Sequence, residues 1–159
     1  LGVDQLKNVI HLINTDPTSR RIILSAWNPC DLDKMALPPC HVMFQCYVIK
    51  DNISLQMYQR SADIGLGLPF NIASYALLLH IIAHLCGLNA HRLIIVVGDA
   101  HVYQNHIEPL KKQLNNNLLK LPKIKLNFNK NRSIGTLNFN DFQLIDYVSH
   151  PSNKMKMAV

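Results

Sequence analysis

Residues 72–86 read IASYALLLHIIAHLC, the longest apolar run in the chain, interrupted only by Ser74, His80 and His84. A helix formed by this run would be apolar on nearly every side, which is typical of a helix packed on several faces. Gly87 follows it and is suited to end it, because glycine adopts the left-handed conformation of helix carboxyl-terminal caps. The run is shorter than the roughly 18 to 20 residues that span a bilayer. We therefore predict a buried central helix and no membrane partner.

The segments around this helix alternate between strand and helix patterns. Residues 42–49 and 53–58 flank the turn residues 50–52, which predicts a β-hairpin. Apolar runs at residues 22–27, 93–97 and 124–128 predict further strands, the second of them buried, and the patterns at residues 6–13 and 107–119 predict helices. The order shows no regular βαβ rhythm. It favours an α+β fold in which a mixed β-sheet layer is packed by helices.

The composition indicates one globular unit with a preference for anions. With 159 residues, 48% of them hydrophobic and 16% charged, the chain can bury one compact core. A net charge of +6 favours an anionic partner, but it does not distinguish a nucleic acid from a membrane surface or a small phosphorylated molecule. The first residues show no signal peptide. The four cysteines include no C-x-x-C pair, so we expect free thiols and a cytoplasmic location.

Cys40 is the cysteine placed best for chemistry. It follows Pro38 and Pro39, which hold the approach to it extended, and precedes His41 at the start of a predicted strand. A thiol at such a boundary can face a cleft. The alternative is that Cys40 is a small core hydrophobe, which is the usual role of a free cysteine and the one expected for the other three.

Two arginine segments could bind a phosphate. Arg60 and Ser61 end a predicted strand and precede the glycine-containing residues 65–69, so a guanidinium, a hydroxyl and backbone N–H groups would converge there. Arg20 and Arg21 form a second candidate clamp before another strand. For both segments the alternative is an ordinary surface ion pair.

Two histidine patterns suggest different roles. His101 and Tyr103 follow the strand at residues 93–97 through Gly98 and could offer two hydrogen bonds from one side, although packing roles are equally compatible. His80 and His84 have the spacing of a two-histidine metal site, but no Glu stands between them and no third ligand is evident. We therefore predict no metal.

Taken in order, these segments resemble the carboxyl-terminal, cysteine-bearing part of thymidylate synthase. The resemblance covers almost the whole chain and rests on several words in family order. They are SAWNP at residues 25–29, LPPCH at 37–41, YQRSAD at 58–63, GLPFNIASY at 67–75, GDAHVY at 98–103 and NHIEPL at 105–110.

The resemblance implies the reductive methylation of dUMP to dTMP. Cys40 would be the nucleophile that adds to C6 of the pyrimidine, and a neighbouring Arg60 would favour the thiolate. The co-substrate implied is 5,10-methylenetetrahydrofolate, which is both one-carbon donor and reductant and leaves as dihydrofolate.

The resemblance also assigns binding roles position by position. Asn71 would read the uracil edge, His101 and Tyr103 would hold the ribose hydroxyl, and His41 and Tyr75 would support the site. Arg20 and Arg21 would reach the site of the neighbouring subunit, which implies a homodimer with shared sites. The full nucleotide set is Arg20, Arg21, Arg60, Ser61, Ala62, Asp63, Asn71, His101, Val102 and Tyr103. The folate set is Asp63, Leu66, Gly67 and the terminal Ala158 and Val159.

One departure from the family pattern concerns completeness. The family has an amino-terminal portion with a further phosphate-binding Arg, a catalytic Glu and a Trp of the folate site, and none of these can be assigned here. We therefore expect residues 1–159 to be the carboxyl-terminal part of a single domain and the active site to be partial. The alternatives are a pyrimidine nucleotide hydroxymethylase of the same superfamily, whose cytosine version Asn71 argues against, and a non-catalytic fragment or weak RNA-binding protein.

Overall fold

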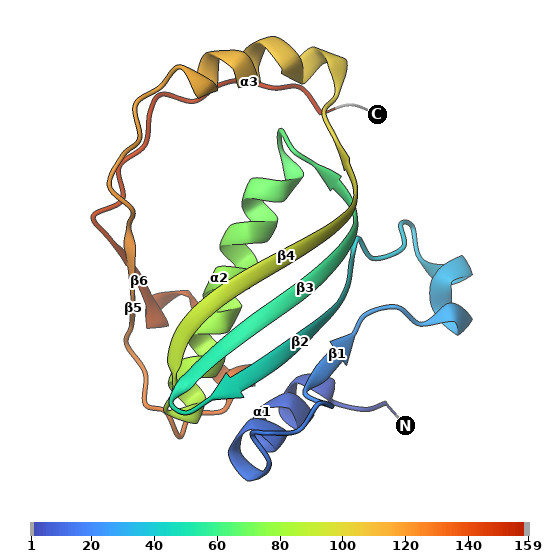
Figure 1. Ribbon diagram of the computed structural model, residues 1–159, viewed down its shortest axis with the longest axis vertical. Coiled ribbons are helices and arrows are strands. Elements are labelled where there is room, and N and C mark those ends of the chain that lie inside the picture. The colour runs from blue at the N-terminus through green and yellow to red at the C-terminus, as the bar shows by residue number, and fades with distance from the viewer. Residues whose placement is uncertain (1, 158–159) are drawn as a thin grey trace.

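The computed structural model describes residues 2–157 and contains a four-stranded mixed sheet in the order β1-β2-β3-β4 (Figure 1). The strands are β1 Ile23–Ser25, β2 His41–Ile49, β3 Asn52–Asp63 and β4 Asn89–His101. The first three are antiparallel, and β3 and β4 are parallel. The hairpin turns at Lys50, whose φ is 52°. The predicted α+β class with a mixed sheet is confirmed.

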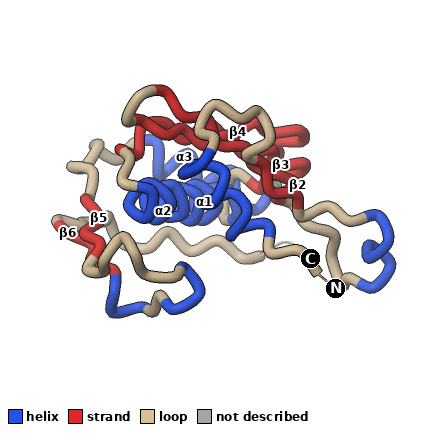
Figure 2. Tube along the Cα trace, turned by 90° about the horizontal axis from the view of Figure 1, so that it is seen from below, coloured by secondary structure: helices blue, strands red, loops and turns tan. Residues whose placement is uncertain are grey.

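Helix α2, Gly67–Cys86, connects β3 to β4 and lies across one face of the sheet (Figures 1 and 2). Two adjacent parallel strands need such a crossover, because the chain must return to the starting end of the sheet before the second strand can begin. The helix ends at Gly87, with φ 67°, as predicted. It begins at Gly67 rather than Ile72, so at 20 residues it is long and apolar enough to meet the length criterion for a membrane span.

The burial of α2 corrects the prediction that its apolar run is buried along its length on several faces. Only its second half is buried, through Leu79, Ile81, Ile82, Ala83 and Leu85. In the first half, Phe70 is 72% and Ile72 45% exposed. Tyr75 of the first half packs on His41 and Phe44, whereas Phe70 and Ile72 are left open to solvent within residues 2–157.

The core lies between α2, the sheet and helix α1, Gln5–Thr15. Because side chains alternate along a strand, one face of the sheet carries the buried residues. These include Phe44 and Cys46 of β2, and Ile53, Leu55 and Met57 of β3. Burial of each large aliphatic side chain stabilises the fold by about 1.5–3 kcal/mol. Helix α1 starts where Asp4 accepts a hydrogen bond from the Lys7 backbone N–H.

The opposite face of the sheet is apolar and exposed. Tyr47 of β2 and Tyr58 of β3 are 60% and 40% exposed, and Ile94 and Val96 of β4 are 41% and 40% exposed. The prediction of a buried strand at residues 93–97 is therefore wrong, because the outer face of the sheet is uncovered and only Leu93 and Ile95 pack against the core. An apolar surface spread over three adjacent strands is typical of an interface.

A β-bulge interrupts the β2–β3 ladder beside Cys40. His41 pairs with Gln59 and Met43 with Tyr58, so Val42 is an extra residue on β2. The bulge brings His41 to the α2 side of the sheet, where its ring lies 5.2 Å from the ring of Tyr75, edge to face.

The carboxyl-terminal third forms an arm around the gap beside α2. Helix α3, Ile107–Leu114, is shorter than the predicted 107–119, because the chain turns at the three asparagines 115–117. Strands β5, Lys123–Leu126, and β6, Phe142–Ile145, pair in a second sheet, and β6 was not predicted. Short 3-10 helices occupy Pro29–Lys34, Gln104–His106, Ile134–Thr136 and Phe139–Asp141.

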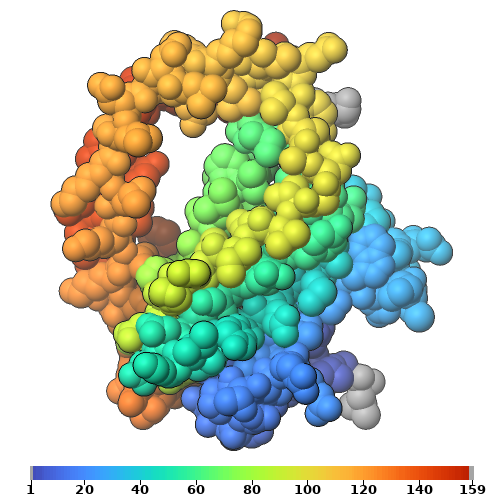
Figure 3. Space-filling model, in the orientation of Figure 1, coloured from blue at the N-terminus to red at the C-terminus, as the bar shows by residue number. Residues whose placement is uncertain are grey.

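The last described residues return along α3. His150 Nε2 lies 2.9 Å from the Asn117 carbonyl oxygen, and Asn153 donates to the Pro109 carbonyl at 2.5 Å. The space-filling view shows an opening between this arm and the first half of α2 with β4 (Figure 3). The exposed half of α2 therefore borders this opening.

Candidate functional site

A cavity of about 440 Å³ lies at the carboxyl ends of β3 and β4, beside the start of α2. Its walls combine a thiol, a guanidinium, a hydroxyl, a carboxylate and amides. The lining residues are Leu37, Cys40, His41, Gln59, Arg60, Ser61, Asp63, Gly67, Asn71, His101 and Tyr103. Most residues proposed from the sequence for the nucleotide site therefore surround one space.

The parallel pairing of β3 and β4 explains this convergence. Ser61 lies opposite Asp99, and Asp63 lies opposite His101. Because parallel strands end at the same edge, residues separated by a whole helix in the sequence become neighbours there. Helix α2 starts at this edge and contributes Gly67 and Asn71 from its first turns.

Arg60 holds the loop that carries Cys40. Its Nε donates to the Pro39 carbonyl at 3.0 Å, and an Nη donates to the Pro38 carbonyl at 2.7 Å. Its backbone N–H donates to the Cys40 carbonyl at 3.0 Å, and its guanidinium lies 5.9 Å from the centre of the Trp27 ring. Since a guanidinium has five N–H donors, three remain for a ligand in the cavity.

Gln59 is a site residue that the sequence analysis missed. It is 2% exposed, and its side-chain nitrogen donates to the Asn71 Oδ1 at 2.9 Å and to the Ser61 carbonyl at 3.0 Å. Its own Oε1 has no hydrogen-bond partner. With Asn71 Oδ1 occupied, the N–H₂ of that amide is the group left free for a ligand. The sequence did contain an indication of this role: Gln59 follows Leu55 and Met57 at intervals of two, so it falls on the buried face of the predicted strand although it is polar.

The opposite wall carries a carboxylate and a group of rings. Asp63 Oδ1 accepts a hydrogen bond from the Gly65 backbone N–H at 2.9 Å. His101 Nδ1 lies 2.9 Å from Asp99 Oδ1, which fixes the orientation of the imidazole. The Tyr103 ring lies 5.2 Å from the His101 ring and 5.6 Å from the His106 ring. Tyr103 is thereby held between two histidines at the cavity wall.

His41 and Tyr75 form a second contact behind the thiol. Burial raises the pKa of Tyr75, so its phenol stays protonated over a wide pH range. This neutral ring packs on His41, which lines the cavity next to Cys40.

Several residues proposed from the sequence lie outside the cavity. Arg20 and Arg21 are exposed in the turn before β1, Ala62 is fully buried in the sheet, and Val102 is 45% exposed on a neighbouring surface. Leu66 lines an adjoining hollow of about 700 Å³ together with Pro69 and Phe70. Ala158 and Val159 lie outside the described residues.

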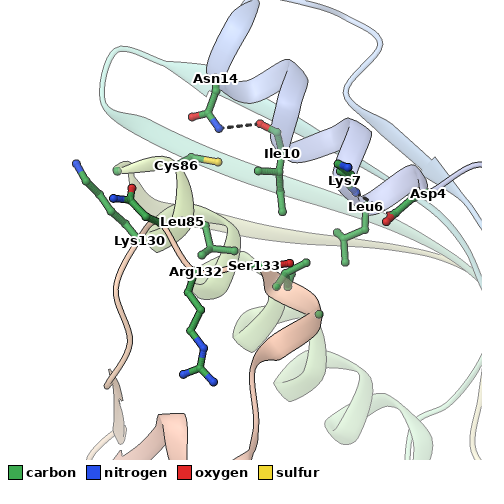
Figure 4. A pocket seen from close by; sticks show the side chains of 14 residues that line it. Asp4, Leu6, Lys7, Ile10, Asn14, Leu85, Cys86, Lys130, Arg132 and Ser133 are labelled. Atoms are coloured by element: carbon green, nitrogen blue, oxygen red, sulfur yellow. Dashed lines mark hydrogen bonds between the residues drawn. The ribbon is translucent and has the colours of Figure 1, made fainter.

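A larger cavity, of about 800 Å³, lies elsewhere, between α1, the end of α2 and residues 130–135 (Figure 4). Its thiol belongs to Cys86, whose pKa burial raises to about 11. Burial and the neighbouring Cys86 raise the pKa of Cys46 to about 12. Both thiols stay protonated at neutral pH and are weak nucleophiles.

His80 and His84, which have the spacing of a two-histidine metal site, are not joined by a third ligand among the described residues. Among residues 2–157, no group of three or more His, Cys, Asp or Glu side chains is arranged to hold a metal ion. His84 has a packing role, with its Nε2 2.7 Å from the Phe128 carbonyl oxygen and its ring edge-on to that of Phe128.

The cavity thus belongs to the class of sites that place a thiol beside anion-binding groups, a guanidinium, a hydroxyl and an amide, at the strand ends of an α+β sheet. The sequence profile of the family described as thymidylate synthase matches residues 1–159. The chain belongs to the thymidylate synthase family.

Individual relatives agree with this membership. The thymidylate synthase of Staphylococcus haemolyticus is 55% identical over 156 residues, covering 98% of this chain and 48% of the relative. The thymidylate synthase of Homo sapiens is 54% identical, covering 99% and 50%. A bifunctional dihydrofolate reductase-thymidylate synthase of Arabidopsis thaliana is also 54% identical, covering 99% and 28%. The chain thus spans about half the length, or less, of these curated relatives.

Proposed function

We propose that this chain supplies the nucleophile and the nucleotide-binding wall of a thymidylate synthase. The reaction is the reductive methylation of dUMP to dTMP with 5,10-methylenetetrahydrofolate, which yields dihydrofolate. The observation that carries the proposal is the cavity in which Cys40 meets Arg60, Ser61, Asn71 and His101. The membership of the family and the names of its relatives support the same activity.

The thiol has a defined task in this reaction. The Cys40 thiolate adds to C6 of the pyrimidine, and the electron pair of the 5,6 double bond moves onto C5 and the ring carbonyl. C5 thereby becomes a carbon nucleophile, which the unmodified ring is not. Arg60 holds the thiol loop through Pro38 and Pro39, so Cys40 is positioned before the ligand arrives.

The remaining groups would fix the nucleotide. The free N–H donors of Arg60 and the Ser61 hydroxyl suit a phosphate dianion. The Asn71 N–H₂ can donate to a carbonyl of the uracil edge, and His101 with Tyr103 can hold the ribose hydroxyl. Arg60, Asn71 and His101 are already oriented by internal hydrogen bonds, which lowers the entropy cost of binding.

A reduced folate fits the neighbouring surface. Asp63 presents a carboxylate at the cavity, suited to the N–H groups of a pterin, and Leu66, Pro69 and Phe70 line the adjoining hollow. Phe70 is 72% exposed, so an aromatic face is open to stacking. When bound there, the folate would supply the one-carbon unit and the hydride.

We further propose a homodimer. The exposed apolar face with Tyr47, Tyr58, Ile94 and Val96 suits a self-complementary interface. Arg20 and Arg21 do not line the cavity of their own chain and are exposed, as a contribution to a neighbouring site requires. The cytoplasmic location, the hydroxymethylase alternative and weak RNA binding stay predictions.

The first half-reaction gives a test that needs no folate. Addition of Cys40 to C6 makes the C5 hydrogen exchangeable, so dUMP in D₂O should lose its C5 proton signal in ¹H NMR. Cys40→Ser should abolish this exchange while calorimetry still detects nucleotide binding, and the exposed Cys30→Ser is the matched control. Exchange that persists in Cys40→Ser, or stops equally in the control, would overturn the assignment of the nucleophile.

A further inference from the structure

The cavity of about 800 Å³ lies at the opposite end of α2 from the candidate site. It is lined by α1, the last turn of α2 and residues 130–135 (Figure 4). It shares no lining residue with the cavity that contains Cys40. The two cavities lie near opposite ends of a 20-residue helix, which extends roughly 30 Å. A ligand of the larger cavity would therefore occupy a second, separate site.

The middle of this cavity is apolar. Leu6 and Ile10 of α1 lie one turn apart on the same face of the helix, and Leu85 of α2 and Ile134 line the cavity from the other elements. Figure 4 shows Leu6, Ile10 and Leu85 pointing into the shared space. The volume of about 800 Å³ is in the range of pockets for drug-sized ligands, about 300–1,000 Å³. The apolar middle therefore suits the body of a ligand with one or two rings.

A buried ion pair holds the loop that forms one wall. Arg132 donates to Asp141 Oδ1 at 2.6 Å and to the Thr136 carbonyl at 2.6 Å. Asp141 is 7% exposed, and its other oxygen accepts a hydrogen bond from the Asn138 backbone N–H at 2.7 Å. Breaking such a charge-assisted network is costly, so residues 130–136 form a preorganised wall. The charge of the guanidinium is balanced by Asp141 and is not available to a ligand.

The remaining charges of the cavity are unbalanced. Among the described residues that line it, Asp4 carries the one carboxylate. Asp4 lies beside Lys7 at the start of α1, where its Oδ1 accepts a hydrogen bond from the Lys7 backbone N–H at 3.0 Å. Lys130 lies at the other end, near Cys86 (Figure 4). Its ammonium is in no ion pair within residues 2–157.

The end of α2 adds a partial negative charge at the same end of the cavity. The last carbonyls of a helix together carry about half an elementary charge. Two of these carbonyls already accept hydrogen bonds from the backbone N–H groups of Gly87 and Leu88. The partial charge is smaller than the full charge of the Lys130 ammonium, so a net positive charge remains there.

We propose that this cavity binds a small organic anion with an apolar body, whose anionic group contacts the ammonium of Lys130. The apolar body lies on Leu6, Ile10 and Leu85, and the anionic group lies at the end away from Asp4. A cationic group in the same place would be repelled by Lys130. Neither the site nor the class of ligand rests on the proposed function at Cys40.

Three naphthalene probes of similar size and different charge test the proposal. They are 2-naphthoate, which is an anion, the neutral 2-naphthamide, and the cation 2-naphthylmethylammonium. Each probe is titrated into the chain with ¹³C-labelled isoleucine methyl groups and followed by NMR. Ile10 and Ile134 report on this cavity. Ile107 and Ile94 report on two other exposed apolar surfaces, beside α3 and on the outer face of the sheet.

We expect 2-naphthoate to move the methyl resonances of Ile10 and Ile134. It should bind about fivefold more tightly than 2-naphthamide, as expected for one partly exposed ion pair, and the cation should bind most weakly. Equal affinities for the three probes would overturn the anion site. Shifts confined to Ile107 or Ile94 would overturn the cavity as the binding site. This comparison uses the unchanged chain, so it does not depend on the folding of any variant.

Two lysine variants locate the anionic group. Lys130→Gln should lower the affinity for 2-naphthoate to that for 2-naphthamide and leave the binding of 2-naphthamide unchanged. Lys7→Gln should change the affinity for 2-naphthoate by less than about twofold, because Asp4 already balances that charge. An equal loss in both variants, or an equal loss of both probes in Lys130→Gln, contradicts the contact with Lys130.

A side chain added at Gly135 should close the site. A Cβ there meets no atom within 4 Å, so Gly135→Phe places a ring at the cavity without displacing the wall, and the binding of 2-naphthoate should be lost. Gly2→Phe is the matched control, since a Cβ at Gly2 also meets no atom within 4 Å and Gly2 does not line the cavity. Binding that persists in Gly135→Phe, or is lost equally in the control, overturns the site.

Discussion

Replacing Arg60 should separate its two roles, holding the thiol loop and binding a phosphate. In Arg60→Ala, the carbonyls of Pro38 and Pro39 lose their donors, and a bound dianion loses its cation. Stranding a charged partner costs about 2 to 5 kcal/mol, which corresponds to a loss of nucleotide affinity of about 30-fold to several thousand-fold. Arg60→Lys keeps the charge, but a single ammonium cannot serve both carbonyls and the phosphate, so its affinity should be intermediate.

Isothermal titration calorimetry with dUMP and with deoxyuridine, which has no phosphate, measures the two roles apart. We expect Arg60→Ala to weaken dUMP binding strongly and deoxyuridine binding by less than about tenfold, the effect of a disturbed loop alone. An equal loss for both ligands would show that Arg60 acts only through the loop. Unchanged dUMP affinity would place the phosphate clamp elsewhere.

Three further changes probe the proposed role of Asn71, the proposed sharing of sites between subunits and the buried thiol of Cys46. Asn71→Asp replaces the N–H₂ that faces the cavity by an acceptor, so competition binding should shift from dUMP towards dCMP, and unchanged discrimination removes Asn71 from this role. Mixing Arg21→Ala subunits with Cys40→Ser subunits should restore one intact site per heterodimer, measured as C5 exchange above either parent; no recovery contradicts shared sites. Burial raises the pKa of Cys46 from 9.0 to about 12, so the folded state keeps a proton that the unfolded chain releases. The free energy of unfolding should therefore fall above pH 9 by up to about 1.4 kcal/mol per pH unit from this thiol, and the slope in denaturant titrations should be smaller in Cys46→Ala.

The sequence predicted the elements whose pattern is local. The hairpin around Lys50 and the stop of α2 at Gly87 depend on turn chemistry and on a left-handed φ, both of which are properties of a few neighbouring residues. Helix α1 was likewise predicted from the spacing of its apolar residues, and its bounds are confirmed within two residues. The turn of the hairpin is confirmed, but its second strand continues five residues beyond the predicted 53–58.

The errors concern burial, which the local pattern does not determine. The strand at residues 93–97 is apolar, yet Ile94 and Val96 are about two-fifths exposed because no element among residues 2–157 covers that face of the sheet. The first half of α2 is also apolar, yet Phe70 and Ile72 are exposed, because no element covers that part of the helix within residues 2–157. An apolar pattern therefore predicts a strand or helix, but it does not determine which of its faces another element covers.

Most residues of the candidate site were predicted from the sequence segments shared with the family rather than from hydrophobic periodicity or residue spacing. Cys40, Arg60 and Asn71 line one cavity, as the resemblance implies. Gln59 was missed because its role, a hydrogen bond that orients the amide of Asn71, exists only once β3 and α2 have packed. The contact between His106 and Asp63 spans 43 positions of sequence, and no spacing rule could have indicated it.

The extra residue at Val42 decides which side of the sheet carries His41, the neighbour of Cys40. In an uninterrupted ladder, the alternation that turns Phe44 and Cys46 inward would turn His41 towards the opposite face, away from Tyr75. A regular pairing that kept Val42 would thus preserve every residue of the candidate site and still turn His41 away from Tyr75 and from the cavity beside Cys40. Deleting Val42 would instead remove the extra residue and leave His41 opposite Gln59 on the same face. The pairing register of β2 and β3 is therefore as necessary to the candidate site as the side chains that line it.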